Sequence, residues 1–286
     1  MKKIIFGGPE AYCSRDEANI IVLPVPFELS TSYIKGTSKG PDAILNASAY
    51  MELYDEELNI ETYKLGIYTA KNLSSARNAE AWLKSITSGT IGILKKNKFP
   101  VILGGEHTVS IGAVRACQQY GIADLSVLQS DAHADLRDSY EKNKLSHACV
   151  ARRVSEICPV TQVGIRSLSA EEAKFKKNSN VTAFYASTNL NSETLNKIIA
   201  SLTKNVYITI DLDAFDPAFL PAVGTPEPGG LNWYEVLNIL RAVCAQKKIV
   251  GFDVVELCPL RRDVRSDFLA AKLIYKLIGY ILGGGL

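Results

Sequence analysis

The chain has 286 residues, of which 47% are hydrophobic and 22% charged, and these are ordinary values for a globular protein with a substantial core. Its formal net charge of +2 comes from interspersed Lys, Arg, Asp and Glu without a basic block. We therefore expect neither a nucleic-acid partner nor binding to an anionic membrane surface.

We expect a cytoplasmic protein. No segment reaches the apolar length of a membrane span, and residues 1–10 are too short and too soon interrupted for a signal peptide. The six cysteines are scattered without a C-x-x-C pair, which indicates buried, reduced thiols.

The first predicted strand covers residues 18–26 and is closed by its prolines, which cannot extend it. Residues 30–41 are rich in Ser, Thr and Gly and are too many for a simple connection, so a plain surface loop and a binding loop are both open. Pro41 suits the first turn of a helix. Another helix is predicted over residues 76–97, where apolar side chains recur at helical spacing.

From residue 101 onwards, predicted strands and helices alternate. The strands are at 101–103, 125–128, 160–165, 181–185, 206–210 and 249–255, and the helices at 108–120, 147–156, 170–176, 192–202, 233–246 and 267–281. This order favours an α/β fold with one mostly parallel sheet and helices on both faces. We expect residues 1–286 to form a single domain, with ligands bound beyond the carboxyl ends of the strands.

A motif of potential metal ligands follows the strand at 125–128. Asp131, His133 and Asp135 stand at i, i+2 and i+4, and alternate side chains of an extended segment point to the same face. The three side chains would therefore converge as metal ligands. A capped turn or an isolated hydrogen-bonded cluster is the alternative.

Two more strand ends carry side chains of this kind. Asp211 and Asp213 repeat the i, i+2 spacing, although aspartates also end strands for turn reasons. His107 follows the strand at 101–103 beside two glycines, where it could instead be a packed core histidine. Four aspartates and two histidines are more ligands than one ion needs, so we predict two divalent ions that share bridging carboxylates.

The ligand types indicate the metal and the reaction class. Oxygen-rich ligation with two imidazoles suits Mn²⁺, or else Fe²⁺ or Co²⁺, better than a thiolate-bound zinc centre. Two such ions can lower the pKa of a shared water and present hydroxide to a planar electrophilic carbon, so hydrolysis is expected. A two-metal phosphoesterase would share the ligands, but no loop here is rich in Arg or Lys as a phosphate would favour.

Two other residues are candidates for catalysis. His147 begins the predicted helix at 147–156 and would be flexibly placed near the metals, which suits a proton shuttle; a helix-start histidine facing solvent is the alternative. Glu256 follows the strand at 249–255 with its carboxylate aimed the same way. The guanidinium group of a substrate would supply this carboxylate with a cationic partner.

Six motifs stand in a fixed order along the chain: GGEHT at 104–108, SDAHAD at 130–135, SHA at 146–148, DLDAFDP at 211–217, GTPEPGG at 224–230 and DVVE at 253–256. In this order they resemble the motifs of the ureohydrolases, the arginase and agmatinase family. Residues 36–41 and 164–167 also fit, so the resemblance covers nearly the whole chain.

The resemblance implies a fold, an assembly and a ligand set. The family fold is a three-layer α/β/α sandwich around a mostly parallel sheet, usually assembled into trimers or hexamers, so we expect a homo-oligomer. Asp131 and Asp211 would bridge two Mn²⁺ ions per subunit. One ion would be held by His107, Asp131, Asp135 and Asp211, and the other by Asp131, His133, Asp211 and Asp213.

It also implies roles for three further residues. His147 matches the family's proton-transfer histidine, and Glu256 matches the carboxylate that orients the guanidinium. Thr225 falls in a Gly-Thr-Pro turn that lines the substrate cavity. The expected substrate is a small guanidino compound.

Two segments near His147 indicate the branch of the family. Arginase-like members carry an Asn shortly after the second ligand motif and a Ser-Gly-Asn stretch before the shuttle histidine, and both bind the α-carboxylate of the amino acid. Here Arg137 stands near the first and residues 141–146 replace the second, which resembles agmatinases. We therefore predict hydrolysis of agmatine to putrescine and urea, a reaction of polyamine biosynthesis.

Alternative functions are open on the sequence alone. Guanidinobutyrate, arginine or formiminoglutamate would need the same chemistry. Residues 221–224 stand where many members have a more glycine-rich turn, and they could narrow or redirect the cavity. A non-catalytic scaffold of the same fold would be marked by decay of the metal ligands, and the sequence shows none.

Overall fold

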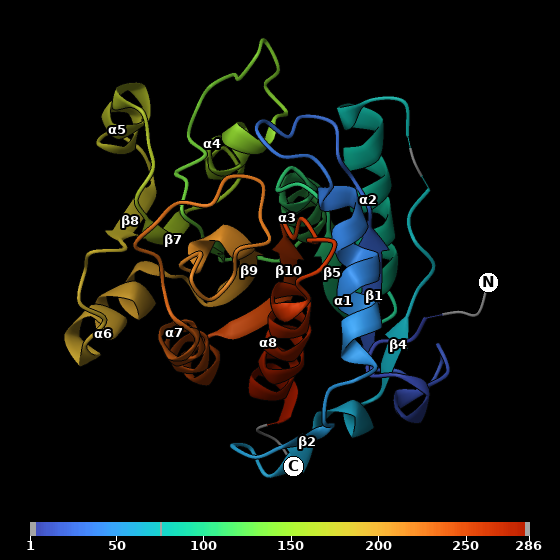
Figure 1. Ribbon diagram of the computed structural model, residues 1–286. Helices are drawn as coiled ribbons and strands as arrows, with labels where there is room; N and C mark the ends of the chain where they lie inside the picture. Colours follow the sequence, from blue (N-terminus) through green and yellow to red (C-terminus); the bar gives the residue numbers. More distant parts are fainter. Residues whose placement is uncertain (1–3, 75, 284–286) are drawn as a thin grey trace.

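The computed structural model describes residues 4–74 and 76–283, which contain one large sheet and a small two-stranded one (Figure 1). The large sheet has the strand order β4-β1-β5-β10-β9-β6-β7-β8, and all its neighbouring strands are parallel. The strands are β1 Ile20–Val25, β4 Ile67–Thr69, β5 Phe99–Gly104, β6 Leu125–Ser130, β7 Val160–Ile165, β8 Val181–Tyr185, β9 Asn205–Asp211 and β10 Lys248–Val255.

Helices cover both faces of this sheet, so the predicted three-layer α/β/α sandwich is confirmed (Figure 1). One face carries α1 (Gly40–Ser48), α6 (Ser192–Ser201), α7 (Trp233–Gln246) and α8 (Arg265–Leu282). The other face carries α2 (Ala79–Leu94), α3 (Val109–Tyr120), α4 (Val150–Ser155) and α5 (Ala170–Lys176).

Each face of the sheet has its own hydrophobic core. Ile44 of α1 and Ile274 of α8 are fully buried on one side, and Leu83 of α2 and Val114 of α3 are fully buried on the other. Burial of each such side chain contributes about 1.5 to 3 kcal/mol. Because both faces are covered, β6 and β7 are buried at every residue, as is usual for strands of a parallel sheet.

Three parts of the fold differ from the prediction. Pro24 does not close the first strand, because β1 continues through it to Val25. The Pro24 carbonyl accepts from Leu73 N–H at 3.0 Å, and in a parallel strand the nitrogen of a residue faces the same side as its carbonyl. On that side β4 has already ended at Thr69, so there is no neighbouring strand to which residue 24 would have to donate an N–H.

The other two differences concern short elements. The edge strand β4 and the hairpin of β2 (Tyr54–Asp55) and β3 (Ile60–Glu61) were not predicted, because segments of two or three residues carry too little periodicity. The helix predicted at 147–156 begins as a 3₁₀ turn, η4 (His147–Cys149), and continues as α4.

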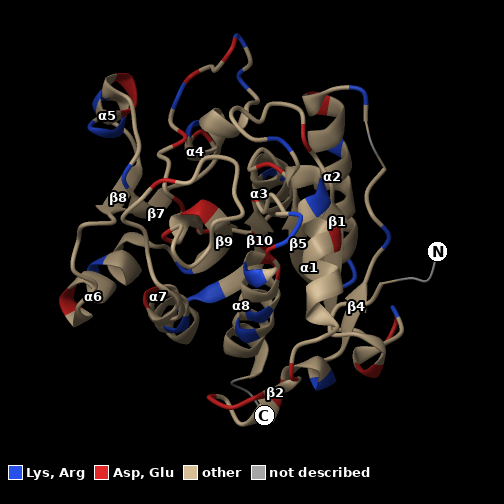
Figure 2. Cartoon of the chain, in the orientation of Figure 1, with Lys and Arg blue, Asp and Glu red and all other residues tan. Residues whose placement is uncertain are grey.

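Charged side chains are spread over many elements. Figure 2 shows Lys and Arg interspersed with Asp and Glu, in line with the mixed charges of the sequence. Among residues 4–74 and 76–283, no helix combines the length and the apolar character needed to cross a membrane. The absence of a nucleic-acid or membrane partner stays a prediction.

Four neighbouring strands at the centre of the sheet bring the predicted site together. β5, β10, β9 and β6 lie side by side and parallel, so their carboxyl ends meet at one edge. His107 comes just after β5, Glu256 after β10 and Asp131 after β6, while Asp211 is the last residue of β9. The order of strands therefore places residues that are distant in the sequence next to one another.

Candidate metal centre and active site

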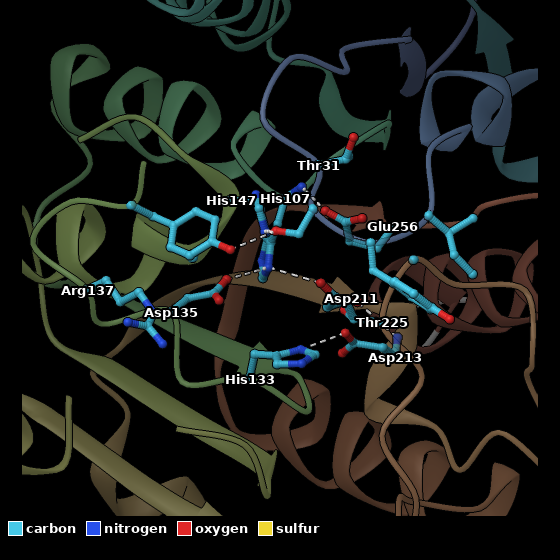
Figure 3. Close-up of a pocket in the computed structure, with 16 residues that line it drawn as sticks. Thr31, His107, His133, Asp135, Arg137, His147, Asp211, Asp213, Thr225 and Glu256 are labelled. Carbon is cyan, nitrogen blue, oxygen red and sulfur yellow. Dashed lines mark hydrogen bonds and ion pairs between the residues drawn. The ribbon is translucent and has the colours of Figure 1, made fainter. Parts of the chain in front are cut away.

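A cavity of about 220 Å³ opens at the edge of the sheet where these four strands end (Figure 3). The walls include residues 31–34 of the loop after β1, so this loop contributes to the cavity, as the binding-loop alternative predicts. Asp131 is fully buried behind the other predicted site residues. All seven of those line the cavity: His107, His133, Asp135, His147, Asp211, Asp213 and Glu256.

His107 is surrounded by carboxylates (Figure 3). Its Nδ1 atom lies 3.1 Å from Asp131 Oδ2, 3.1 Å from Asp135 Oδ2 and 3.2 Å from Asp211 Oδ2, yet it makes no hydrogen bond of good geometry. Burial lowers the pKa of His107, but the three carboxylates together raise it well above its ordinary value. They therefore draw positive charge to the space beside Nδ1.

The other nitrogen of His107 indicates which kind of positive charge fits. Nε2 lies 3.0 Å from Thr209 Oγ1, and the Thr209 hydroxyl donates its one hydrogen to Asp253 Oδ1 at 2.7 Å. The Ser110 hydroxyl donates to the same carboxylate oxygen at 3.0 Å. The Thr209 oxygen is thus an acceptor, so Nε2 carries the proton in the neutral ring and Nδ1 presents a lone pair to the carboxylates. A lone pair among carboxylate oxygens fits a metal cation.

A second group of ligands lies beside the first and shares Asp131 with it. His133 Nδ1 is 2.8 Å from Asp213 Oδ2 and 3.8 Å from Asp131 Oδ1. Burial lowers the pKa of His133, whereas the neighbouring carboxylates, Asp213 above all, raise it to about 11. In this group, and in that of His107, Asp131 and Asp135, the ligand atoms lie within 4.8 Å of one another, so each group could hold a metal ion.

The buried aspartates repel one another. Burial, followed by the charges of neighbouring carboxylates, raises the pKa of Asp131, that of Asp135 to about 7, and that of Asp211 well above its ordinary value. Burial also raises the pKa of Asp213, but the hydrogen bond and charge of His133 outweigh it and hold the pKa at about 2. Buried charges are tolerated when they are paired or coordinate a metal, so the group requires cations.

Hydrogen bonds from a side-chain amide and from main-chain N–H groups fix the orientation of the carboxylates. The Gln129 side-chain amide donates to Asp131 Oδ2 at 2.7 Å, and His133 N–H donates to Asp131 Oδ1 at 2.6 Å. Ala132 N–H donates to Asp213 Oδ1 at 3.0 Å. Such outer contacts orient the ligands of metal sites.

Glu256 presents a carboxylate to the cavity. Its Oε1 accepts from His107 N–H at 2.6 Å, and burial, followed by the charge of Glu106, raises its pKa well above the ordinary value. A cation bound in the cavity would favour the ionised form. Glu256 (φ 66°) and Asp135 (φ 52°) both have left-handed backbone, a strain of order 1 to 3 kcal/mol that clusters at functional sites.

His147 is held in place on the cavity wall, in contrast to the flexible placement that we expected. Its Nδ1 lies 3.2 Å from Ser30 Oγ, its Nε2 lies 3.0 Å from Ser32 Oγ, and the Tyr140 ring packs edge-to-face against it at a centroid distance of 5.7 Å. Burial, followed by the positive charges of the other two histidines, lowers the pKa of His147 to about 4. The ring is therefore neutral near pH 7 and able to accept a proton.

Arg166 joins two loops at the rim of the site. One loop contains Asp213, a candidate ligand, and the other is the segment 224–230 that includes Thr225 of the cavity wall. The Arg166 guanidinium donates, over 2.7 to 3.3 Å, to the main-chain carbonyls of Gly164, Asp213, Ala214, Phe215 and Glu227. Arg166 therefore links the main chain at Asp213 to the loop that carries Thr225.

Sequence reasoning did not single out the polar residues that support the ligands. Thr209 and Asp253 gave a usable signal, because each is a polar residue inside an apolar strand and needs a hydrogen-bond partner there. Ser30 and Ser32 gave none beyond their place in a candidate binding loop.

Comparisons with known proteins agree with this geometry. A sequence profile described as the arginase family matches residues 18–279. An N(1)-aminopropylagmatine ureohydrolase of Synechocystis sp. is 43% identical over 280 residues, which are 95% of this chain and 92% of that protein. An agmatinase of Pyrococcus horikoshii is 34% identical over 266 residues, 92% of each protein. The crystal structure of agmatine ureohydrolase of Thermoplasma volcanium matches with a TM-score of 0.88 and 33% identity, covering 98% of this chain and 94% of that one.

Proposed function

The chain belongs to the arginase family and is a hydrolase of the ureohydrolase type, and from this premise we propose that it removes urea from a guanidino amine. The preferred substrate in this proposal is N(1)-aminopropylagmatine, with agmatine, the substrate predicted from the sequence, as the second candidate. The observation that carries the proposal is the floor of the cavity, where metal-type side chains meet beside the buried carboxylate of Glu256.

The proposed cofactor is a pair of Mn²⁺ ions. An oxygen-rich ligand set with two imidazoles suits this ion, and the two ligand groups that share Asp131 support a pair. Asp211 would take part as well, since its Oδ2 lies 3.2 Å from His107 Nδ1. When bound, such ions lower the pKa of a water molecule and so supply a nucleophile at neutral pH.

The side chains of the cavity have separate tasks in this proposal. Glu256 orients the guanidinium: its Oε1 is held by His107 N–H, so Oε2 is free for the guanidinium N–H groups. The water oxygen adds to the guanidinium carbon, the bond from that carbon to the alkyl nitrogen breaks, and the departing amine gains a proton as urea forms. His147, neutral and on the cavity wall, carries protons in this exchange.

The relatives support an amine-bearing substrate, and the cavity wall indicates the course that its tail would take. The relatives that are similar over nearly the whole chain include N(1)-aminopropylagmatine ureohydrolases and an agmatinase. In addition, Arg137 lies on one wall of the cavity, and Thr31 and Thr225 lie across from it in the view of Figure 3. A cationic tail would be repelled by Arg137 and would leave the cavity along the threonine wall.

The test is urea release from the Mn²⁺-loaded chain with N(1)-aminopropylagmatine, agmatine, 4-guanidinobutyrate and arginine. We expect urea from the first two, together with spermidine and putrescine respectively, and a higher kcat/KM for the first. Urea from 4-guanidinobutyrate or arginine alone would reassign the substrate. No release from any of the four would contradict the proposed substrate class.

A further inference from the structure

An unbroken line of hydrogen-bonding groups crosses the cavity wall from the core to the surface. It begins at Glu106, which is fully buried, and passes through Ser30 to Nδ1 of His147. From Nε2 of His147 it continues to the hydroxyl of Ser32, which lies 3.0 Å away. The Ser32 hydroxyl is also placed to donate to the Tyr140 hydroxyl at 3.5 Å, the limit of a hydrogen bond. Ser32 and Tyr140 line the cavity.

At the inner end of this line, the Glu106 carboxylate accepts four hydrogen bonds. Glu106 Oε2 accepts from the main-chain N–H groups of Leu29 and Ser30, each at 2.6 Å. Glu106 Oε1 accepts from the hydroxyls of Ser30 at 2.6 Å and Thr108 at 2.8 Å. Four donors on two oxygens leave this side chain as an acceptor only.

The Ser30 hydroxyl therefore fixes the direction of the next hydrogen bond. A serine hydroxyl has one hydrogen, and that of Ser30 is given to Glu106. The Ser30 oxygen can then only accept. It accepts from the main-chain N–H of His147 at 3.0 Å, and it lies 3.2 Å from the ring nitrogen Nδ1 of the same residue. If Nδ1 had no hydrogen, two lone pairs would face each other. Ser146 Oγ, 3.3 Å from the same nitrogen, can donate or accept and so suits either tautomer.

We propose, on the basis of the proposed function, that Ser30 and Glu106 are positioning residues that fix His147 as the Nδ1–H tautomer, and that Ser32 relays protons from Nε2 to the cavity mouth. In this arrangement the Nε2 lone pair faces the Ser32 hydroxyl, whose one hydrogen turns to Nε2 at 3.0 Å in preference to the longer contact with Tyr140 at 3.5 Å. Nε2 accepts a proton while Nδ1 keeps its own. Nε2 later returns that proton by one of two routes. It passes either to the departing amine or to the Ser32 oxygen, and in the second case the Ser32 hydrogen passes on to Tyr140 or solvent. The other tautomer would offer its lone pair to the core.

The tautomer is measured directly by solid-state ¹⁵N NMR of the full chain labelled with [¹⁵N]histidine and loaded with diamagnetic Zn²⁺. The chain has three histidines, so the His147→Asn variant assigns the His147 signals by difference. We expect a protonated Nδ1 and an unprotonated Nε2. The Ser30→Ala variant should shift His147 towards the Nε2–H tautomer, Ser30→Thr should restore the original signals, and Ser146→Ala should leave them unchanged. A protonated Nε2 in the natural chain, or no change on Ser30→Ala, would overturn the positioning role.

The relay role of Ser32 has its own kinetic test. Ser32→Ala should lower kcat for urea release roughly tenfold, a part of the 10² to 10⁴ that positioned proton transfer contributes, with KM within about twofold of the original. Small buffers such as imidazole should restore kcat by carrying the proton. Loss through KM, or a kcat loss that buffer does not restore, would overturn the relay. If no guanidino amine is hydrolysed, the proposed function and the relay fail together, whereas the NMR result still decides the tautomer.

Discussion

At the scale of single residues, the hydroxyl of Thr209 decides which nitrogen of His107 faces the carboxylates. The hydroxyl gives its hydrogen to Asp253 and accepts from Nε2, so the Nδ1 lone pair is directed to the ligand group. A ligand in the wrong tautomer would have to rearrange before it could bind a cation. In the proposed function, Thr209 would therefore support metal binding without being a ligand itself.

Replacing Thr209 by Val should weaken Mn²⁺ binding by roughly tenfold to a hundredfold, because the ring loses the acceptor that fixes its tautomer. Isothermal titration of the metal-free chain measures this change. Thr161→Val is the matched control, since Thr161 is an equally buried strand threonine whose hydroxyl contacts Ser201 at 2.8 Å away from the cavity. Unchanged affinity in the Thr209 variant would show that this contact does not orient His107.

Arg137 should discriminate between substrate tails by charge. Its guanidinium lies 5.6 Å from the centre of the Tyr140 ring on the cavity wall, and its side chain is 39% exposed. The Arg137→Gln variant removes a repulsion of at most about 1 kcal/mol at such an exposed position, so kcat/KM for agmatine should rise by up to about fivefold. The kcat/KM for 4-guanidinobutyrate should fall, because its anionic tail would lose an attractive charge. A parallel change for both substrates would contradict this role.

His147 should make stability depend on pH. Its pKa in the folded chain is about 4 because the ring is buried near the other two histidines, against about 6.5 in an unfolded chain. The unfolded chain therefore binds the extra proton more readily, and the stability due to the neutral ring is present above pH 6.5 and is lost as the pH falls through 4. Chemical unfolding between pH 7 and 4 should show the natural chain losing about 1 to 3 kcal/mol relative to His147→Asn. A constant difference would contradict the lowered pKa.

The residues that could be predicted from sequence are those that bear the chemistry. Asp131, His133 and Asp135 are recognisable because ligand-type side chains at alternate positions after a strand are unusual, and the structure brings His133 and Asp135 to the cavity with Asp131 buried behind them. Their supports could not be predicted, because each is a contact across the chain. Ser30 precedes His147 by 117 residues, and nothing local to either residue indicates that they meet.

At the scale of elements, long and fully buried segments were predictable, and short or exposed ones were not. The strands β6 and β7 are apolar throughout because helices cover both faces of the sheet. The edge strand β4 and the two-residue strands of the β2–β3 hairpin depend instead on their neighbours. The prediction that Pro24 closes the first strand was wrong for the same reason, because the effect of a proline on a strand depends on whether a neighbouring strand lies beside its nitrogen.

Substitutions in a tight turn of the loop before His147 should stabilise the fold. Tyr140 and Asn143 exchange main-chain hydrogen bonds at 2.9 and 2.8 Å, and the residues between them, Glu141 (φ 48°) and Lys142 (φ 64°), are both left-handed. Such two-residue turns favour Asn-Gly. The double variant Glu141→Asn, Lys142→Gly should therefore raise the free energy of unfolding by about 0.5 to 1 kcal/mol, measured by chemical denaturation.

Lys144→Gly is the control for this turn. Lys144 lies in the same exposed loop but outside the left-handed region. Glycine there adds freedom to the unfolded chain and removes an exposed ion pair with Asp138 at 3.4 Å, so it should not stabilise the fold. If the double variant and Lys144→Gly have the same effect, strain in the turn is not the cause.

At the scale of the whole molecule, the site ties the centre of the sheet together. The proposed ligands follow β5 and β6 or end β9, and Glu256 follows β10, so the buried carboxylates meet only when these four central strands are assembled. Their mutual repulsion disfavours the folded state until cations are bound. The single-domain organisation, the homo-oligomeric assembly and the cytoplasmic location stay predictions.

Metal removal should accordingly lower thermal stability. A metal that binds only the folded chain stabilises it by about 2.7 kcal/mol at a hundred times its Kd, which corresponds to a rise in Tm of roughly 5 to 10 °C for a chain of this size. Calorimetry of the chelator-treated chain with and without Mn²⁺ measures this rise. The Asp131→Asn, Asp211→Asn variant should show little or no rise, and a full rise in that variant would place the stabilising ion elsewhere.

The clamp made by Arg166 has a consequence for how this enzyme can change its substrate. Within the described part of the chain, each hydrogen bond of the guanidinium goes to a main-chain carbonyl, so these contacts do not depend on the side chains of the residues that it holds. Mutations at Thr225, which lines the cavity, can therefore alter its wall while Arg166 still holds the main chain at Glu227. Laboratory evolution towards longer or differently charged guanidino compounds would do well to start from this loop and to leave Arg166 untouched.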